Sequence, residues 1–530
     1  MVQILDFLKR SNAGRGSSPK IVLTADETMM SKYRGGIFIG FSTCMPQGIL
    51  PDWLYFSTFA PPVPRENGRA VFADFGLRMI EASLRENGFD ESEVVVVHPD
   101  DLEKMVGPET EIVAIGGHDL LGINPPTSEF VELAATGPPY NRVKFLELLE
   151  SPALRDVNVV VGGKSAWQVA DERVMDRLGI DYVHIGEGER SIPEMFSKIL
   201  NGEEVPRIVE GEEVPVEDIP NLRGWVIYGL VEIMRGCGRG CKFCTPGMQK
   251  LRHKPIDHIL RDVKTNLEAG AKNIGLHSED VLRYGTYEIA PNREKVLELF
   301  KKVSDLNGVK AMGTSHVALA TVYHNPDLVR DVSEIFHTLP EQERIGTQTG
   351  IETGSPRLME KHMRGKALPS SPEKWPEIVD QSLGLLDDNN WTPACTLING
   401  LPGETRDDAA KTLELLDEIK NHTALIVPLN FVSMEGSSLS KENSLRAEGV
   451  YPEHWQILGE CMEHDAEIAR SLKSDKIRGN VLIKWLFEHF SDYLIKGAEK
   501  YAEGMKAGNP PKNYSEISED YTVPEVLKTE

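Results

Sequence analysis

The sequence predicts an α/β protein in which a parallel-sheet domain precedes a second, barrel-like series of strand–helix units. Continuous β-branched runs that alternate with helical stretches are typical of a parallel sheet covered on both faces. Four such runs stand in the first half of the chain, at 94–97, 112–115, 157–161 and 183–185. A second series starts near residue 226, and three cysteines follow its first strand within eight residues.

Glycine-rich turns follow the last three strands of the first series, at 116–118, 162–164 and 186–189. In an open parallel sheet, ligands bind at the carboxyl ends of the strands, where the backbone must come close to them. Glycine after one strand is common, but glycine after three successive strands covers a whole sheet edge. We therefore expect a large, flat ligand at this edge.

The second series contains about six strands that alternate with helices, which predicts a barrel or part of one. The expected strands are 230–234, 273–277, 311–315, 345–351, 394–398 and 424–431. Among the helices, 255–269 places apolar residues on one face and is followed by Gly270 as a terminator. The tail from about residue 440 is expected to be mostly helical and becomes polar after Gly497.

These patterns divide the chain into four parts. Residues 1–60 are expected to be an N-terminal extension with two short apolar runs, and a proline-rich connector follows at 61–64. The sheet domain is expected at 61–205, and a linker rich in Glu, Pro and Val follows at 203–220. The barrel is expected at 220–435 and the helical C-terminal region at 436–530.

Composition excludes several classes of protein. The chain has 530 residues with 82 acidic and 58 basic side chains, so its net charge is 58 − 82 = −24. Such a surface repels nucleic acids and anionic lipids, so neither is expected as a partner. No run approaches the ~18 apolar residues of a membrane span, and the first residues lack a secretory signal pattern, so a cytoplasmic location is expected. A local basic patch around Lys250, Arg252, His253 and Lys254 stays open as an alternative to a solvated loop.

Cys237, Cys241 and Cys244 stand in the order C-x3-C-x2-C, directly after the strand that opens the second series. Three thiolates this close can converge on one metal centre, and soft thiolates select zinc, copper(I) or iron–sulfur. A structural zinc site needs four ligands, which here would require His253 or His258 from beyond a loop. Three cysteines on a cubane cluster leave one iron free, and glycines at 236, 238 and 240 allow a tight loop around it.

This cysteine motif, with the aromatic Phe243 before its last cysteine, resembles the signature of the radical S-adenosylmethionine (SAM) superfamily. The resemblance implies a [4Fe-4S] cluster on the three cysteines. It also implies that the open iron binds the amino and carboxylate groups of SAM, with Phe243 nearby. A reduced cluster would then cleave SAM to a 5′-deoxyadenosyl radical.

Further segments fit the same superfamily. Members hold the SAM amino group with polar residues after the second barrel strand, which implies Ser278 and Glu279 here. The segment 350–355 resembles G-I-E-S-G, whose glutamate, Glu352 here, faces SAM, and 400–405 resembles the G-x-P-G-E-T turn. Ser315, at the end of the third strand, either touches SAM or is a buried serine satisfied by its surroundings.

A Rossmann-like domain that ends in a G-E-G-E turn ahead of such a barrel resembles the cobalamin-binding architecture. Many cobalamin domains carry D-x-H-x-x-G, but His118 has Gly116 where the aspartate would stand, so we expect cobalt without a histidine ligand. The resemblance implies cobalamin contacts at these residues: Gly117, His118, Asp119, Gly122, Gly162, Gly163, Gly186, Glu187 and Gly188.

The combination implies a class B radical SAM methyltransferase that methylates an unactivated sp3 carbon, with one SAM for the radical and another for the methyl group. The chain most resembles a group from methane-producing archaea whose glutamine C-methyltransferase modifies methyl-coenzyme M reductase. That resemblance implies a post-translational modification connected with methanogenesis. The implied partners are a protein or peptide substrate, the alpha subunit of methyl-coenzyme M reductase, and an electron donor such as a ferredoxin.

Two alternatives remain. One is another cobalamin-dependent radical SAM enzyme that methylates a different carbon, forms a ring or inserts sulfur. Sulfur insertion usually needs a second cluster, whereas Cys44, Cys395 and Cys461 are scattered in the sequence. The other is a cobalamin or iron–sulfur sensor without enzymatic activity, which would not need SAM-facing glutamates at both 279 and 352.

Overall fold

The computed structural model describes residues 18–33, 37–134, 136–445, 449–473, 496–497, 499–500, 502–511 and 524–527. The chain divides into two units, which are described separately below. The first unit comprises Met1–Gly122, Pro138–Ile227 and Val523–Glu530. The second comprises Ile123–Gly137 and Tyr228–Thr522 and is called the barrel unit here.

The first unit contains a six-stranded sheet in the order β5-β1-β6-β7-β8-β9, and all of its neighbouring strands are parallel. Its strands are β1 (Ile21–Ala25), β5 (Val94–Val96), β6 (Ile112–Gly116), β7 (Asn158–Gly162), β8 (Tyr182–Gly186) and β9 (Ile208–Gly211). Counted along the chain, this is the flavodoxin-like order 2-1-3-4-5 with one more strand at the edge. Such an order reverses direction between β1 and β6, which is where open sheets bind ligands.

The sheet extends beyond the boundaries expected from the sequence. β1 comes from the stretch expected as an N-terminal extension, yet it pairs with both β5 and β6, and all five of its residues are buried. β9 lies within the expected linker and pairs with β8. The run IVLTA is too short and isolated to reveal its place inside the sheet, because its partner strands come from distant parts of the chain.

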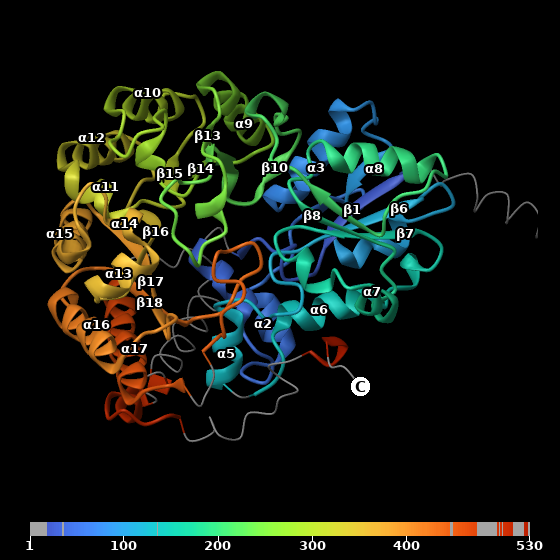
Figure 1. Cartoon of the computed structure of the whole chain (residues 1–530). Helices are drawn as coiled ribbons and strands as arrows, with labels where there is room; N and C mark the ends of the chain where they lie inside the picture. Colours follow the sequence, from blue (N-terminus) through green and yellow to red (C-terminus); the bar gives the residue numbers. More distant parts are fainter. Residues whose placement is uncertain are drawn as a thin grey trace, which may run out of the picture. The chain divides into compact units, whose positions relative to one another are not determined.

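Helices cover both faces of this sheet (Figure 1). The helices of the unit are α2 (Asp52–Thr58), α3 (Phe75–Glu86), α4 (Leu102–Met105), α6 (Tyr140–Leu149), α7 (Glu172–Leu178) and α8 (Ser191–Leu200). In α8, Ile192, Met195, Phe196 and Ile199 follow helical spacing, and all four are buried against the same core as β1. α3 begins at Asp74, whose side chain accepts a hydrogen bond from the Gly76 backbone N–H. The short strands outside the sheet are β2 (Arg65–Glu66), β3 (Arg69–Ala70), β4 (Phe72–Ala73) and β10 (Trp225–Val226).

The barrel unit confirms the predicted series of parallel strands. They are β11 (Leu230–Glu232), β14 (Asn273–His277), β15 (Ala311–Thr314), β16 (Ile345–Glu352), β17 (Trp391–Asn399) and β18 (Leu425–Asn430). They form two three-stranded parallel sheets, β11-β14-β15 and β16-β17-β18. A parallel bridge between His316 and Gln348 joins the two sheets just beyond β15. A short antiparallel pair, β12 (Met234–Arg235) and β13 (Arg252–His253), flanks the cysteine loop.

The helices of the barrel unit lie around the outside of these strands (Figure 1). They are α9 (Ile256–Glu268), α10 (Arg293–Ser304), α11 (Leu319–His324), α12 (Pro326–His337), α13 (Pro356–His362), α14 (Arg364–Ala367), α15 (Trp375–Asp388), α16 (Arg406–Ile419) and α17 (Pro452–Lys473). In α9, Ile259 and Val263 are fully buried, which confirms the predicted apolar face. α5 (Thr127–Ala134) also belongs to this unit, and the buried Glu129 carboxylate accepts a hydrogen bond from the Asn430 backbone N–H at the end of β18.

The C-terminal region expected to be helical is described mainly by α17. Residues 474–495 and 512–523 lie outside the described residues, so the predicted character of those stretches stays a prediction. In the part of the chain that the structure describes, no helix is both long enough and apolar enough to cross a membrane.

The run around residue 250 does not form one basic patch, because Lys250 is exposed whereas Arg252 and Lys254 are buried. Arg252 is 7% exposed, and Lys254 is 1% exposed and forms an ion pair of 2.9 Å with the buried Asp262. Arg252 lies on β13 and Lys254 follows this strand directly, and both side chains are buried within the barrel unit. Their positive charge is therefore not presented to a ligand at the surface.

The turn after β17 ends in a capping box that starts α16. Thr405 Oγ1 donates to Asp408 at 2.6 Å, and the Thr405 backbone N–H donates to the same carboxylate. Replacing Thr405 with alanine removes one partner of this N-cap, so we expect the free energy of unfolding to fall by about 1 kcal/mol. Urea unfolding would measure the change, and Thr405→Ser, which keeps the hydroxyl, should stay close to wild type. Equal losses for both variants would contradict the capping role.

Candidate functional site

The three cysteines lie on a loop between β12 and β13. Cys237 is 9% and Cys241 7% exposed, while Cys244 is half-buried. Gly236, Gly238 and Gly240 all adopt positive φ angles, between 68° and 70°. Non-glycine residues rarely take this conformation, so the alternating glycines are what allow the loop to curl. The loop geometry therefore agrees with the tight fold predicted from its sequence.

The buried Arg239 side chain hydrogen-bonds this loop to neighbouring segments of the barrel unit. Its Nη2 donates to Thr321 Oγ1 at 2.7 Å and to Asp280 Oδ2 at 3.2 Å. Its Nη1 donates to the backbone carbonyl of Gly365 at 3.1 Å. The side chains of Arg239 and Asp280 are 4% and 0% exposed, so this ion pair is buried. One guanidinium thus ties the loop to the segment after β14 and to α14.

Two further contacts anchor the ends of the loop. The Arg283 guanidinium donates to the Cys237 backbone carbonyl at 2.7 Å, and Arg283 itself is 1% exposed. The Lys242 backbone N–H donates to the His362 carbonyl at 2.9 Å. The positions of the cysteines are therefore set by the barrel unit around them and not by the loop alone.

Burial controls the ionisation of the three thiols. It raises the pKa of Cys241 to about 11 and of Cys244 to about 12, and it also raises the pKa of Cys237. The charge on each neighbouring thiolate adds to these increases for Cys241 and Cys244. The thiols are therefore close enough to interact, and a metal that binds them must displace their protons.

The donor set fits an iron–sulfur cluster better than a zinc ion. Among the described residues, no three His, Cys, Asp or Glu side chains surround a position for one metal ion. A cubane cluster does not need such convergence, because each cysteine binds a different iron. His253 is an unsuitable fourth zinc ligand, since its Nε2 donates to the Thr286 carbonyl and its Nδ1 accepts from the Gly285 N–H.

The predicted SAM-binding residues of the β14 and β15 ends lie together. Ser315 Oγ donates to the Ser278 carbonyl at 2.8 Å and accepts from the Ser278 N–H at 3.0 Å. Ser315 therefore clips the two strand ends together through its hydroxyl. Glu279 is half-buried and acts electrostatically on both Cys237 and Cys244. This carboxylate consequently lies on the cysteine side of the strand end.

Glu352 ends β16 in a strained conformation. Its φ is +64°, and its side chain is 6% exposed. Lys366 Nζ lies 2.5 Å from Glu352 Oε1, and Thr396 Oγ1 donates to Oε2 at 3.0 Å. Left-handed backbone at a non-glycine residue costs energy, and such residues cluster at functional sites.

Phe243, the aromatic residue before the last cysteine of the loop, is partly buried and packs against the core of the barrel unit.

Three residues of this site were not predicted from the sequence: Arg239, Asp280 and Lys366. Arg239 stands between the cysteines and Asp280 directly follows Glu279, so their positions within motifs offered a signal. Lys366 offered none, because only the packing of α14 brings it to Glu352.

The predicted cobalamin residues occupy strand ends in the first unit. His118 Nε2 lies 3.0 Å from Asp74 Oδ2, and this carboxylate raises the pKa of the imidazole. The His118 side chain is 58% exposed. Asp119 Oδ1 accepts from Gln168 Nε2 at 2.7 Å, and Gly122 has a φ of +63°. Asp74 thus supplies a carboxylate partner from outside the 116–122 segment.

Most of the glycines at these strand ends are used by the fold itself. A Cβ on Gly163 would lie 2.5 Å from the Gly117 carbonyl oxygen, and one on Gly186 would lie 2.4 Å from the Gly211 oxygen. Added Cβ atoms on Gly117 and Gly188 would meet the Leu120 and Ile192 side chains. Gly162 differs, because a Cβ there would make only ordinary contact at 3.9 Å. Glu187 Oε2 accepts from the Val214 N–H at 2.9 Å.

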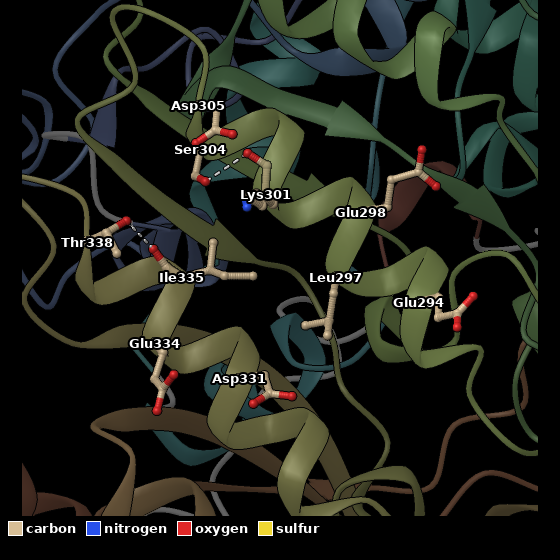
Figure 2. A pocket seen from close by; sticks show the side chains of 10 residues that line it. All are labelled: Glu294, Leu297, Glu298, Lys301, Ser304, Asp305, Asp331, Glu334, Ile335 and Thr338. Carbon is tan, nitrogen blue, oxygen red and sulfur yellow. Dashed lines mark hydrogen bonds between the residues drawn. The ribbon is translucent and has the colours of Figure 1, made fainter.

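A groove of about 650 Å³ lies elsewhere on the barrel unit, between α10 and α12 (Figure 2). Carboxylates dominate its lining, among them Glu294, Glu298 and Asp331. None of the predicted site residues lines it. The groove is acidic and lies on outer helices, so it is not part of the cysteine site.

Comparison with known proteins supports the interpretation of the cysteine loop. The family model of the radical SAM superfamily matches residues 231–416. A tRNA-2-methylthio-N(6)-dimethylallyladenosine synthase of Thermoanaerobacter sp. is 28% identical over 286 residues, which cover 50% of this chain and 55% of that protein. The ribosomal protein uS12 methylthiotransferase RimO of Thermosipho melanesiensis is 29% identical over 294 residues, 54% of this chain and 62% of that protein. The chain thus spans little more than half the length of these relatives.

Among solved structures, the radical S-adenosylmethionine methyltransferase TsrM from Kitasatospora setae has a TM-score of 0.49 at 13% identity, over 79% of this chain and 75% of that chain. The match to the family model carries the assignment. It begins inside β11, spans the three loop cysteines and ends in α16. Residues 231–416 are therefore similar to a radical SAM domain.

Proposed function

We propose that this chain is a cobalamin-dependent radical SAM methyltransferase of class B that methylates an sp3 carbon. The observation that carries the proposal is the buried loop of Cys237, Cys241 and Cys244 with the carboxylates of Glu279 and Glu352 close enough to act electrostatically on its thiols. The cysteines would hold a [4Fe-4S] cluster. The two carboxylates can accept hydrogen bonds from the ammonium group of SAM, because charge-assisted bonds of this kind are strong.

The chain's own contribution is binding, orientation and exclusion of water. The bound cofactors would supply the radical and the methyl group. Arg239 and Arg283 hold the loop backbone in place, and Ser315 fixes the end of β14 next to it. Thr396 and Lys366 hold the Glu352 carboxylate in one orientation. This pre-arranged shell is what a site that controls a reactive radical requires.

The proposal of cobalamin is supported by the first unit. Its strand order places a direction reversal between β1 and β6, and His118 follows β6 directly. Large ligands bind at such a point in open parallel sheets. The Asp74 carboxylate pairs with His118 Nε2 and raises the pKa of the imidazole, which favours the protonated ring that cannot bind cobalt.

This leads to a spectroscopic prediction. Electron paramagnetic resonance of the cobalt(II) form should lack superhyperfine splitting from a protein nitrogen, because the Asp74 carboxylate raises the pKa of His118 and favours its protonated ring. His118→Ala should leave the spectrum unchanged, and free cob(II)alamin with its own base bound is the positive control. Splitting that disappears in His118→Ala would show that this histidine ligates cobalt.

For the substrate, we propose the Cα of a glutamine in the alpha subunit of methyl-coenzyme M reductase, with a ferredoxin as a candidate electron donor. Resemblance in sequence supports this substrate, and the reacting Cα–H is weakened by its flanking amide groups. The test is an anaerobic reaction of the reconstituted chain with a peptide that covers the glutamine. The peptide should gain one CH2 on its backbone carbon, and 5′-deoxyadenosine and S-adenosylhomocysteine should both accumulate. Formation of 5′-deoxyadenosine with an unchanged peptide would refute the substrate and retain the radical chemistry.

Methylthiolation is the second candidate, and the methylthiotransferases among the relatives favour it. A second three-cysteine cluster would have to use the remaining cysteines. Cys395 lies within β17 and Cys461 within α17, both in the core of the barrel unit, and Cys44 belongs to the first unit. This distribution supports methylation. A product that gains sulfur as well as a methyl group would decide for methylthiolation.

A further inference from the structure

Lys366 is a buried cation beside the cysteine loop, and neither the cysteine motif nor the SAM-facing segments account for it. It lies on α14, and its side chain is 15% exposed. Gly350 on β16 has no side chain, and the ion pair of Lys366 with Glu352 occupies the space that a side chain there would need. A Cβ there would lie 1.7 Å from Glu352 Oε1 and 2.5 Å from Lys366 Nζ. The strand is therefore shaped to admit this pair.

The helix that carries Lys366 is fastened directly to the cysteine loop. Arg239 donates to the Gly365 carbonyl, and a Cβ on Gly365 would lie 1.9 Å from the Arg239 carbonyl oxygen. On the preceding helix, α13, the backbone carbonyl of His362 accepts a hydrogen bond from the Lys242 backbone N–H. The backbone that carries Lys366 is therefore fixed relative to the cysteine loop, and the ion pair with Glu352 holds its ammonium group.

The charge of Lys366 reaches two of the three thiols. The Lys366 ammonium interacts with Cys241, and its helix is hydrogen-bonded to the cysteine loop through the Gly365 carbonyl and Arg239. Cys244 interacts with the same ammonium. Other charges around the loop include the buried Arg239–Asp280 pair, Arg283, which donates to the Cys237 carbonyl, and the Glu279 carboxylate. Lys366 thus adds a positive charge next to the sulfurs, and Glu352 offsets part of it.

We propose that Lys366 raises the reduction potential of the iron–sulfur cluster and that Glu352 limits this increase. Reduction adds negative charge to the cluster, so a fixed cation nearby stabilises the reduced form, and the low dielectric of a buried site strengthens the effect. Burying an ion pair costs free energy, and apolar side chains of similar size often stabilise a protein as well or better. Stability alone is therefore not a sufficient reason for the Lys366–Glu352 pair. The inference rests on the cluster-binding part of the proposed function and is independent of the methyl acceptor.

The test is a redox titration of the anaerobically reconstituted full chain, without SAM, followed by electron paramagnetic resonance of the reduced cluster. In Lys366→Met, the ratio of reduced to oxidised cluster at a fixed potential should fall about tenfold, which corresponds to about 59 mV for a one-electron couple. Lys366→Arg should stay near wild type, and Glu352→Gln should shift the ratio in the opposite direction. Lys374→Met is the matched control, because Lys374 is exposed and carries the same charge.

Each outcome decides for or against the proposal. The proposal is overturned if the reduction potential of the cluster in Lys366→Met equals that of wild type. It is also overturned if Lys374→Met shifts the potential by the same amount as Lys366→Met. If Lys366→Met does not hold the cluster, Glu352→Gln decides, and a potential that does not rise would overturn the proposal. A wild-type chain that binds no iron after reconstitution would refute the proposed function itself, which is a different result from an unchanged potential.

Discussion

Replacing Cys241 with alanine is expected to abolish both the cluster absorbance and the cleavage of SAM. Cys241 is the middle cysteine of the loop, is 7% exposed, and interacts with Cys237, Glu352 and Lys366. With one thiolate removed, only two remain for a cluster that the family holds with three, and no other cysteine stands near the loop in the sequence. Iron and sulfide analysis after anaerobic reconstitution, together with an assay of 5′-deoxyadenosine, would measure the loss.

Cys44→Ala is the matched control for this experiment. Cys44 is also buried, at 8% exposure, but it belongs to the first unit. We expect this variant to retain about four iron per chain, as does the wild type. A Cys241→Ala variant that keeps its absorbance and still cleaves SAM would contradict the assignment of the ligands.

Replacing Arg239 with methionine is expected to destabilise the barrel unit by about 3–5 kcal/mol, the usual cost of leaving one partner of a buried ion pair alone. Asp280 is 0% exposed and would lose its cationic partner. The loop would also lose its hydrogen bonds to Thr321 and Gly365. Urea unfolding followed by tryptophan fluorescence is suitable, since Trp375 and Trp391 are fully buried in this unit. Iron binding after reconstitution should fall in parallel.

An exposed pair in the same unit supplies the control. Arg293 and Asp331 form an ion pair whose side chains are 56% and 32% exposed. Solvent screens such pairs, so Arg293→Met should cost less than about 1 kcal/mol. If the Arg239 and Arg293 variants lose the same free energy, the buried Arg239–Asp280 pair does not stabilise the loop in the way we describe.

Much of the fold could be predicted because it depends on local patterns. The runs 273–277 and 112–115 are apolar and β-branched or flanked by turns, and they form β14 and β6. The cysteine loop was equally visible, since its ligands and its glycines lie within a single segment of nine residues. Secondary structure and a contiguous motif need only neighbours along the chain, and the sequence displays those neighbours directly.

Other features depend on the order in which distant strands assemble. The apolar run 21–25 became an interior strand only because β5 and β6 pair with it on either side. Arg252 and Lys254 resemble surface charges in the sequence, yet the β12–β13 pair turns them inward. Long-range pairing of this kind leaves no periodic trace in the segment itself.

By itself, the sequence determined the strand–helix series, the cysteine motif and the glutamates placed after the barrel strands. The tertiary structure alone decided which charges meet inside the protein. Lys366 lies 14 residues from Glu352 and Asp280 lies 41 residues from Arg239, and only packing brings each pair together. A buried charge needs a partner wherever the chain can supply one, so these pairings follow from strand order and burial and from no local pattern.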